Sequence, residues 1–196
     1  MKYSLILLSL LFFSFTTSSK LADDRLGVKG PLKFNNINFH LVWADKPSEK
    51  YHLQEYLPEG EKVETFNEML TIHLFDTDIK TKDAVQQKIK ELTKRRKTDP
   101  VCNYVVTESP DGKEFMVDFL LSESKGYEMT IVEFNVYRYK QVDIGANNKG
   151  IIVYAYSKRS YGDDITPFFK TLKNDRTEYL NQMISAEIPV VTTVGK

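Results

Sequence analysis

The chain has a single cysteine, Cys102, among its 196 residues, and it contains no Asn-x-Ser/Thr site for glycosylation. One cysteine cannot form an internal disulfide, so the fold depends on its apolar core and not on cross-links. Secreted eukaryotic proteins of this length often have paired cysteines or a glycosylation site. The absence of both favours a bacterial protein exported to the periplasm or to the cell surface.

The chain also lacks an excess of either charge, because its 27 Lys and Arg residues balance its 27 Asp and Glu residues. A protein that binds nucleic acid or an anionic membrane mainly by charge normally carries a basic excess. The composition therefore argues against a nucleic-acid partner.

Motifs of known catalytic classes are absent as well. The chain has no His-Glu-x-x-His, no Gly-x-Ser-x-Gly and no glycine-rich phosphate loop. The three histidines, His40, His52 and His73, lie on three different predicted strands, and no pair has the spacing of metal ligands. The sequence therefore predicts no catalytic residue, no metal site and no cofactor. A metal site assembled from the three strands is the alternative.

The N-terminus does carry a recognisable pattern. Lys2 precedes an apolar run over residues 5–15, which is followed by small residues at 16–19. This order is typical of a secretory signal peptide, and the run is too short to span a bilayer as a helix. We expect cleavage after Ser19, with Ser18 as the near alternative. The new N-terminus has no cysteine to carry a lipid, so a lipoprotein is not expected. An uncleaved anchor is the other interpretation.

The rest of the chain predicts one domain. Residues 20–33 are polar and predict a leader, residues 34–186 predict a single α+β domain, and residues 187–196 predict a flexible C-terminal tail. Strands are expected from alternating apolar residues and turn signals; their ranges are 37–43, 51–57, 68–75, 101–108, 114–121, 127–141 and 151–156.

Two amphipathic helices complete the predicted domain. The first covers residues 81–97 with Thr81 as its N-cap, and the second begins with Thr166 as N-cap and Pro167 at the first helical position. The tight turns at 109–112 and 147–150 predict hairpins. We therefore expect a mainly antiparallel sheet of six to seven strands, in the order βββ-α-ββββ-α, with both helices packed on one face.

The strand predicted over residues 127–141 has two particular features. Residues 130–136 are apolar on both faces, which indicates a central position in the sheet. The apolar face also changes partway along the strand, which indicates a bulge or a strong twist.

One segment resembles a known group of proteins. Residues 55–61 read Glu-Tyr-Leu-Pro-Glu-Gly-Glu, and residues 66–71 read Phe-Asn-Glu-Met-Leu-Thr. This pattern of Pro-x-Gly, an aromatic residue, Glu and Met is similar to that of a broad group of uncharacterised exported bacterial proteins. Phe66 stands where that group usually has Trp. The resemblance covers about residues 51–186. It implies an exported α+β domain and brings no activity.

Several polar residues have both a functional and a structural interpretation. Cys102 is either a nucleophile or a buried core residue, and its local sequence favours the core. Asp163 and Asp164 either bind a cation or complement the start of the last helix, which we favour. The basic run 94–97 either binds an anionic partner or complements the end of the first helix, which again we favour.

The last strands hold a charged pair and a group of tyrosines. Glu133 and Arg138 are expected to pair with neighbouring strands, and a bulge between them would place both on one face. The tyrosines form either an aromatic surface for protein or glycan or, as we favour, a sheet face covered by the last helix; they are Tyr137, Tyr139, Tyr154, Tyr156 and Tyr161.

These observations favour a non-catalytic exported protein, namely a binding, chaperone-like or envelope-assembly module whose partner is a protein or an envelope component. The alternative is a small envelope hydrolase with a strand-assembled site, such as His73 with Glu68 or Glu133. An inhibitor or immunity-type protein with one tight protein partner is a third hypothesis.

Overall fold

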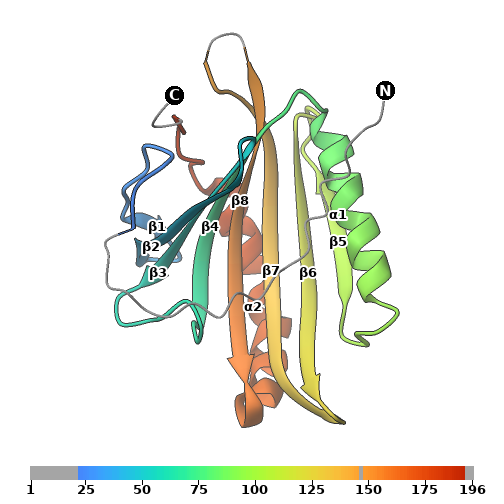
Figure 1. Cartoon of the computed structure of the whole chain (residues 1–196). Helices are drawn as coiled ribbons and strands as arrows, with labels where there is room; N and C mark the ends of the chain where they lie inside the picture. Colours follow the sequence, from blue (N-terminus) through green and yellow to red (C-terminus); the bar gives the residue numbers. More distant parts are fainter. Residues whose placement is uncertain (1–21, 146–147, 193–196) are drawn as a thin grey trace.

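The computed structural model describes residues 22–145 and 148–192, and it shows an α+β fold built on one curled antiparallel sheet (Figure 1). The predicted signal peptide and its cleavage site lie outside the described residues. The strands are β1 (Leu32–Phe34), β2 (Ile37–Ser48), β3 (Tyr51–Pro58), β4 (Glu68–Asp76), β5 (Asn103–Glu108), β6 (Glu114–Lys125), β7 (Glu128–Asp143) and β8 (Lys149–Tyr161).

The order of strands across the sheet is β1-β2-β3-β4-β8-β7-β6-β5, and every neighbouring pair is antiparallel. The chain thus forms two runs of adjacent strands, and β4 joins them by pairing with β8. The prediction of a mainly antiparallel sheet is confirmed. The predicted strand number is wrong because β1, with only 3 residues, is too short to show an alternating pattern.

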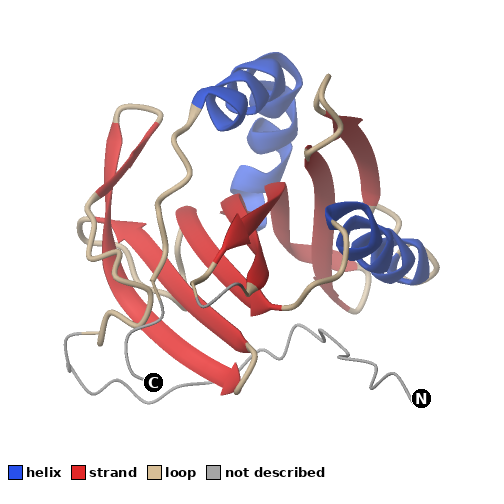
Figure 2. Cartoon of the chain, turned by 90° about the horizontal axis from the view of Figure 1, so that it is seen from above, coloured by secondary structure: helices blue, strands red, loops and turns tan. Residues whose placement is uncertain are grey.

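The two helices, α1 (Thr81–Arg95) and α2 (Ile165–Ser185), pack on opposite faces of the sheet (Figure 2). The even-numbered residues of β7 and β8 pack with α2, whereas the odd-numbered residues pack in a separate core with α1. The expectation that one face carries both helices is therefore wrong. The physical reason is that β7 and β8 are apolar on both faces, so each face requires its own cover.

The larger core lies on the α2 side. Phe168, Leu172 and Met183 of α2 pack there against strands from both halves of the sheet. The largest fully buried side chains include Phe39, Tyr56, Phe134, Tyr154 and Tyr156, all of which belong to this core. The smaller core lies on the α1 side, where Val85 and Leu92 of α1 contact β6, β7 and β8.

The segment predicted as a polar leader packs into the domain. Leu26 is 0% exposed, and Val28 and Leu32 are also buried in the α2-side core. The Oε1 atom of Gln54 on β3 accepts hydrogen bonds from the backbone N–H groups of Arg25 and Leu26 at 2.6 and 3.0 Å. The sparse apolar residues of this segment have no period, so the sequence does not show that they are buried.

The C-terminal segment predicted as a flexible tail is also anchored as far as residue 192. Val191 is buried in the α2-side core, and the backbone N–H of Thr192 donates to the carbonyl of Leu26 at 2.8 Å. The two ends of the described chain therefore stabilise one another.

The helix starts differ slightly from the prediction. Lys80 occupies the N-cap of α1 and Asp164 that of α2, where Thr81 and Thr166 were expected. A short 3₁₀ helix, Gly162–Asp164, leads directly into α2 and moves its start two residues earlier. Pro167 remains within the first turn, where its missing N–H has no intrahelical partner to lose.

The long strand β7 lies between β8 and β6, so its predicted central position is confirmed. Its pairing with β8 is continuous from Ile131 to Asp143, and the only register shift in its pairing with β6 lies at Glu123/Ser124. This shift is a bulge on β7, because one step on β6 corresponds to two steps on β7, from Met129 to Ile131. The predicted bulge is therefore present, but it lies near the start of the strand and not between Glu133 and Arg138.

Candidate functional site

The three histidines do not come together. His40 and His73 project on the α1 side, with His40 exposed, whereas His52 pairs with Leu74 and projects on the α2 side. Among residues 22–145 and 148–192, no group of three or more His, Cys, Asp or Glu side chains is arranged to hold a metal ion. The alternative of a metal site built from the three histidines therefore has no geometric support.

His73 instead lies in an aromatic environment. Its Nδ1 atom is 2.8 Å from the hydroxyl of Tyr51 on β3. Its ring centroid is 5.9 Å from that of Tyr137 on β7. Burial and the nearby charge of Lys88 lower the pKa of His73 to about 3. The imidazole is therefore neutral at physiological pH.

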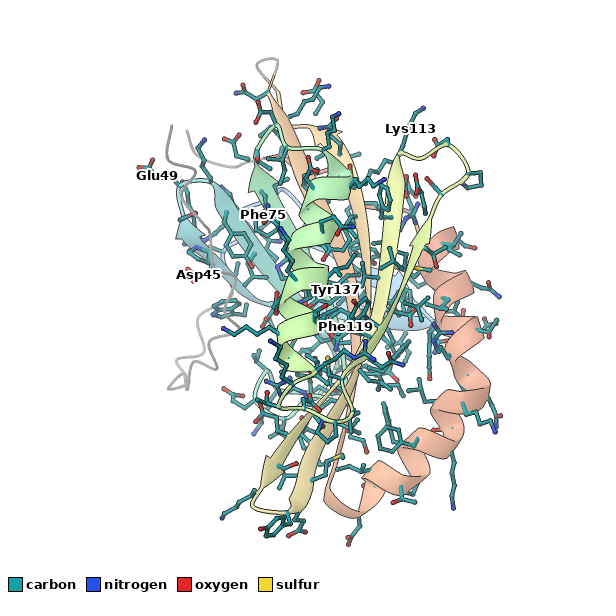
Figure 3. All side chains as sticks on the ribbon, turned by 90° about the vertical axis from the view of Figure 1, so that its right-hand side faces the viewer. Asp45, Glu49, Phe75, Lys113, Phe119 and Tyr137 are labelled. Carbon is teal, nitrogen blue, oxygen red and sulfur yellow. The ribbon has the colours of Figure 1, made fainter. Side chains whose placement is uncertain are left out.

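Further rings extend this arrangement in both directions. Tyr51 stacks on Phe75 with centroids 4.6 Å apart, and Tyr137 meets Phe119 edge-on at 4.9 Å. Figure 3 shows Phe75, Tyr137 and Phe119 beside helix α1. Together with Glu55 and Lys88, these side chains form what we call the α1-side cluster; its members are Tyr51, Glu55, His73, Phe75, Lys88, Phe119 and Tyr137.

Lys88 closes the cluster from the helix. Its ammonium lies 4.9 Å from the centroid of Phe119 and 5.2 Å from that of Tyr137, and it pairs with Glu91 at 3.1 Å. The side chain of Lys88 is only 4% exposed. Its long aliphatic stem covers the rings, while Glu91 and the two π faces stabilise its charge.

Glu55 is the least expected member of the cluster. It projects from β3 between Trp43 of β2 and Thr71 of β4 in the sheet register. Burial raises the pKa of Glu55 to about 7, the charge of Arg159 opposes that shift, and the charge of Glu133 adds to it. The carboxyl group is therefore protonated in a large fraction of molecules near neutral pH, and in that form it both donates and accepts hydrogen bonds.

An ion pair lies beside the cluster. Arg159 of β8 and Glu133 of β7 are opposite one another in the register, and the Nε atom of Arg159 donates to Glu133 at 2.7 Å. The guanidinium of Arg159 also lies 4.0 Å from the centroid of the Phe66 ring. The two charges compensate one another, so the pair adds no net charge beside the cluster.

Three buried polar atoms on this face have no hydrogen-bond partner among the described residues. They are Oε2 of Glu55, Nε2 of His73 and Nδ2 of Asn135. More than 90% of buried polar groups in folded proteins are hydrogen-bonded, so each exception calls for an explanation. Their positions on β3, β4 and β7 place three unsatisfied groups on the face that α1 covers only in part.

The residues of that face are not fully enclosed. The side chains of Trp43, Leu53, Glu55, His73 and Tyr137 are half-buried, even though the polar atoms of Glu55 and His73 named above are fully covered. This face therefore has partly exposed aromatic side chains beside covered polar atoms that have no hydrogen-bond partner.

The predicted tyrosine group divides between the two faces. Tyr154 and Tyr156 are buried on the α2 side, where Tyr156 lies 5.5 Å from Tyr179 of α2. The preferred prediction, a face covered by the last helix, is confirmed for these two. Tyr137 and Tyr139 face α1 instead, so the tyrosines do not form one surface.

Glu133 and Arg138 both pair with neighbouring strands, as predicted. Glu133 pairs with Arg159 on the α1 side, and Arg138 pairs with Glu114 of β6 at 2.7 Å on the α2 side. Because the two residues are separated by an odd number of positions without a bulge, they face opposite sides of the sheet. The idea that both face one side is wrong.

The carboxylates proposed for a hydrolytic site are not near His73. Glu68 projects on the α2 side and pairs with Lys158. His73 pairs with Val153 of β8, which pairs in turn with Tyr139 of β7. Glu133 lies six residues along β7 from Tyr139, which corresponds to about 20 Å at the usual rise of a strand. The hydrogen-bond partner of His73 is a tyrosine, so neither predicted histidine–carboxylate pair is present.

The remaining candidates lie outside the cluster. Cys102 is buried, its Sγ donates to the carbonyl of Leu92 at 3.5 Å, and burial raises its pKa. In the basic run, Lys94 and Arg95 occupy the last turn of α1. Asp163 and Asp164 are exposed beside the start of α2, and Asp164 makes no side-chain capping bond there.

The sequence patterns did not single out Tyr51, Glu55 or Lys88 as functional candidates. A signal was present for two of them, because Tyr51 and Glu55 belong to the alternating set that also contains Leu53 and Leu57. A carboxylate within an apolar set marks a buried polar group. Lys88 carries no such signal, because lysine on a helix is normally read as solvent-facing.

Comparisons with known proteins place the chain in one group. The sequence model of an uncharacterised protein family matches residues 26–188. No curated protein and no solved structure matches the chain. Within the described part of the chain, no helix is both long enough and apolar enough to cross a membrane.

Proposed function

The chain belongs to this uncharacterised family, whose match covers residues 26–188, and we propose that it is an exported, non-catalytic binding protein whose ligand site is the α1-side cluster. The export half of the proposal rests on the charged, apolar, small-residue order of residues 1–19. The binding half rests on one structural observation, namely the unsatisfied Glu55, His73 and Asn135 atoms beside half-buried aromatic rings.

The chemistry of the cluster indicates the class of ligand. His73 is neutral, Glu55 is neutral in a large fraction of molecules, Lys88 is paired with Glu91, and Arg159 is paired with Glu133. A charged ligand would find no unpaired opposite charge there. The site therefore suits a neutral envelope component with an apolar face, which packs on the rings, and several hydroxyl or amide groups, which satisfy the polar atoms.

A non-catalytic role is also consistent with the arrangement of the titratable groups. Hydrolysis by histidine requires a partner that orients the ring and accepts charge as the reaction proceeds. Tyr51 is a poor partner of that kind, because burial and the charges of Glu55 and Asp45 raise its pKa. The proposal therefore assigns the polar atoms to recognition.

Native mass spectrometry of the protein purified from the envelope of its own cells tests this proposal. We expect a bound mass that is released on unfolding and that is absent from the Glu55→Ala variant. His52→Gln is the matched control, because His52 lies on the same strand and faces the α2 side. A bare wild-type chain that also fails to bind a panel of neutral envelope glycans and peptides would contradict the proposal.

A further inference from the structure

The two edges of the sheet are protected to very different degrees. The β1 edge is a strand of 3 residues, and very short edge strands are one of the ways in which proteins prevent edge-to-edge pairing. The β5 edge has 6 residues, Asn103–Glu108, with no proline, lysine or bulge. Val105 is 47% exposed and Val106 is 38% exposed. The β5 edge is therefore free to pair with another strand.

The register between β5 and β6 shows which backbone groups point outward. The N–H of Ser109 donates to the carbonyl of Glu114 at 2.9 Å, and the pairing continues in step to Asn103 and Leu120. Hydrogen-bonded and non-hydrogen-bonded pairs alternate in an antiparallel ladder. Odd-numbered residues of β5 thus bond to β6, whereas the N–H and C=O groups of Tyr104, Val106 and Glu108 point away from the sheet.

We infer that this edge pairs with the β5 strand of a second copy of the chain, in an antiparallel register centred on Val106. Val106 then lies opposite its counterpart, and Tyr104 lies opposite Glu108 of the other copy. Every outward N–H and C=O of the strand obtains a partner, and the β-branched side chains of Val106 pack against one another across the strands. The result is one continuous sheet through both copies.

Charge complementarity favours this occupant over an unrelated strand. The guanidinium of Arg96 lies 5.7 Å from the centroid of the Tyr104 ring. Tyr104 and Glu108 both project on the α1 side of the sheet, opposite Phe119 and Phe115. In the proposed register, Glu108 of one copy therefore reaches Arg96 of the other, and the two-fold symmetry produces this contact twice.

Helix α1 reaches the β5 edge at its C-terminal end. Its main packing is on β6 and β7, but the hydroxyl of Thr93 also lies 3.1 Å from that of Tyr104, and Arg96 lies over the Tyr104 ring. These contacts hold Arg96 beside Tyr104 at the edge where the second copy would pair.

Sedimentation velocity over a micromolar concentration series tests the inference, with the full chain expressed so that any processing of residues 1–19 takes place. We expect a concentration-dependent dimer for the wild type and a monomer for Val106→Pro. That substitution removes an outward N–H and leaves the β5–β6 bonds in place. Val106→Thr is the matched control and should still dimerise. A wild type that stays monomeric throughout, or a Val106→Pro variant that dimerises equally, would overturn the inference.

A charge exchange tests the register. Arg96→Glu and Glu108→Arg should each weaken dimerisation about tenfold, and the double variant should recover most of that loss because the pair is restored in reversed form. Additive losses in the double variant would exclude this register. Circular dichroism melts of all variants establish that the monomers are folded.

Discussion

At the scale of single residues, the unusual feature is a set of polar groups inside an apolar face. Glu55, His73 and Lys88 come from three elements, and each has an apolar or aromatic neighbour where a surface residue would have water. Burial shifts the pKa values of Glu55 and His73 in opposite directions, because it raises the pKa of a carboxylic acid and lowers that of an imidazole. Both shifts favour the neutral form.

Glu55 should therefore make the protein less stable as the pH rises. Its pKa is about 7 in the folded state, against an ordinary value of 4.5, so the folded state retains a proton that the unfolded chain has lost. Stability should fall between about pH 4.5 and pH 7, by on the order of 3 kcal/mol in total, and stay level above that range.

The Glu55→Gln variant tests this dependence. It should lose the decline attributable to Glu55 and be more stable than wild type at pH 8, as measured by urea unfolding at a series of pH values. Glu59→Gln is the control, because Glu59 is exposed to solvent and directly follows the same strand, β3. Wild-type and Glu55→Gln curves that run parallel from pH 4.5 to pH 8 would show that the buried acid does not retain its proton.

At the scale of elements, Arg138 joins the sheet to the end of α2. Its Nη1 donates to the carbonyls of Met183, Ile184 and Ala186 at 2.8, 3.0 and 2.8 Å, and its Nε pairs with Glu114. The last carbonyls of a helix have no partner within the helix. A residue of β7 thus provides the C-terminal cap that the local sequence of α2 does not.

Arg138→Met should destabilise the protein by about 2–4 kcal/mol, because it leaves the α2 carbonyls unpaired and removes one partner of a mostly buried Glu114. The matched control is Lys140→Met, which removes the other partner of Glu114. The side chain of Lys140 is 44% exposed against 16% for Arg138, so this variant should lose less than about 1 kcal/mol. If chemical unfolding gave both variants the same loss of unfolding free energy, the cap on the end of α2 would contribute nothing to stability.

At the scale of the whole molecule, both ends of the described chain belong to the fold. Leu26 and Val191 are buried in the same core, and the backbone of Thr192 bonds to that of Leu26. The structured domain therefore begins before Phe34, close after the predicted cleavage site. Cleavage after Ser19 would leave only a few residues ahead of the first buried side chain.

Our proposal of export predicts a mature chain that starts at Lys20. Intact mass spectrometry of the protein recovered from the cell envelope should give the mass of residues 20–196, with one residue more if cleavage follows Ser18. Introducing Arg at Thr17 and Ser19 removes the small residues that the cleavage step needs, so the uncleaved chain should accumulate in the membrane fraction. Recovery of a full-length wild-type protein from the envelope would instead support the anchor interpretation.

Local patterns in the sequence determined much of this protein. Alternation in β2, β3, β4 and β6, the turn at residues 109–112 and the apolar stripe of α1 are set by neighbouring residues, and each was readable without a structure. The α+β class and the antiparallel hairpins follow from them. β1 and the buried residues 26–32 gave no period and were missed.

Only the tertiary structure decided which surfaces meet. The pairing of β4 with β8 joins residues about eighty positions apart, and this contact places Tyr51, His73 and Tyr137 on one face. It also separates Glu68 and Arg138 from His73 by the thickness of the sheet. Alternation shows that a strand has two faces, but the burial of each face depends on helices packed from elsewhere in the chain. The candidate site is therefore a product of long-range packing, and local sequence patterns indicate only some of its residues.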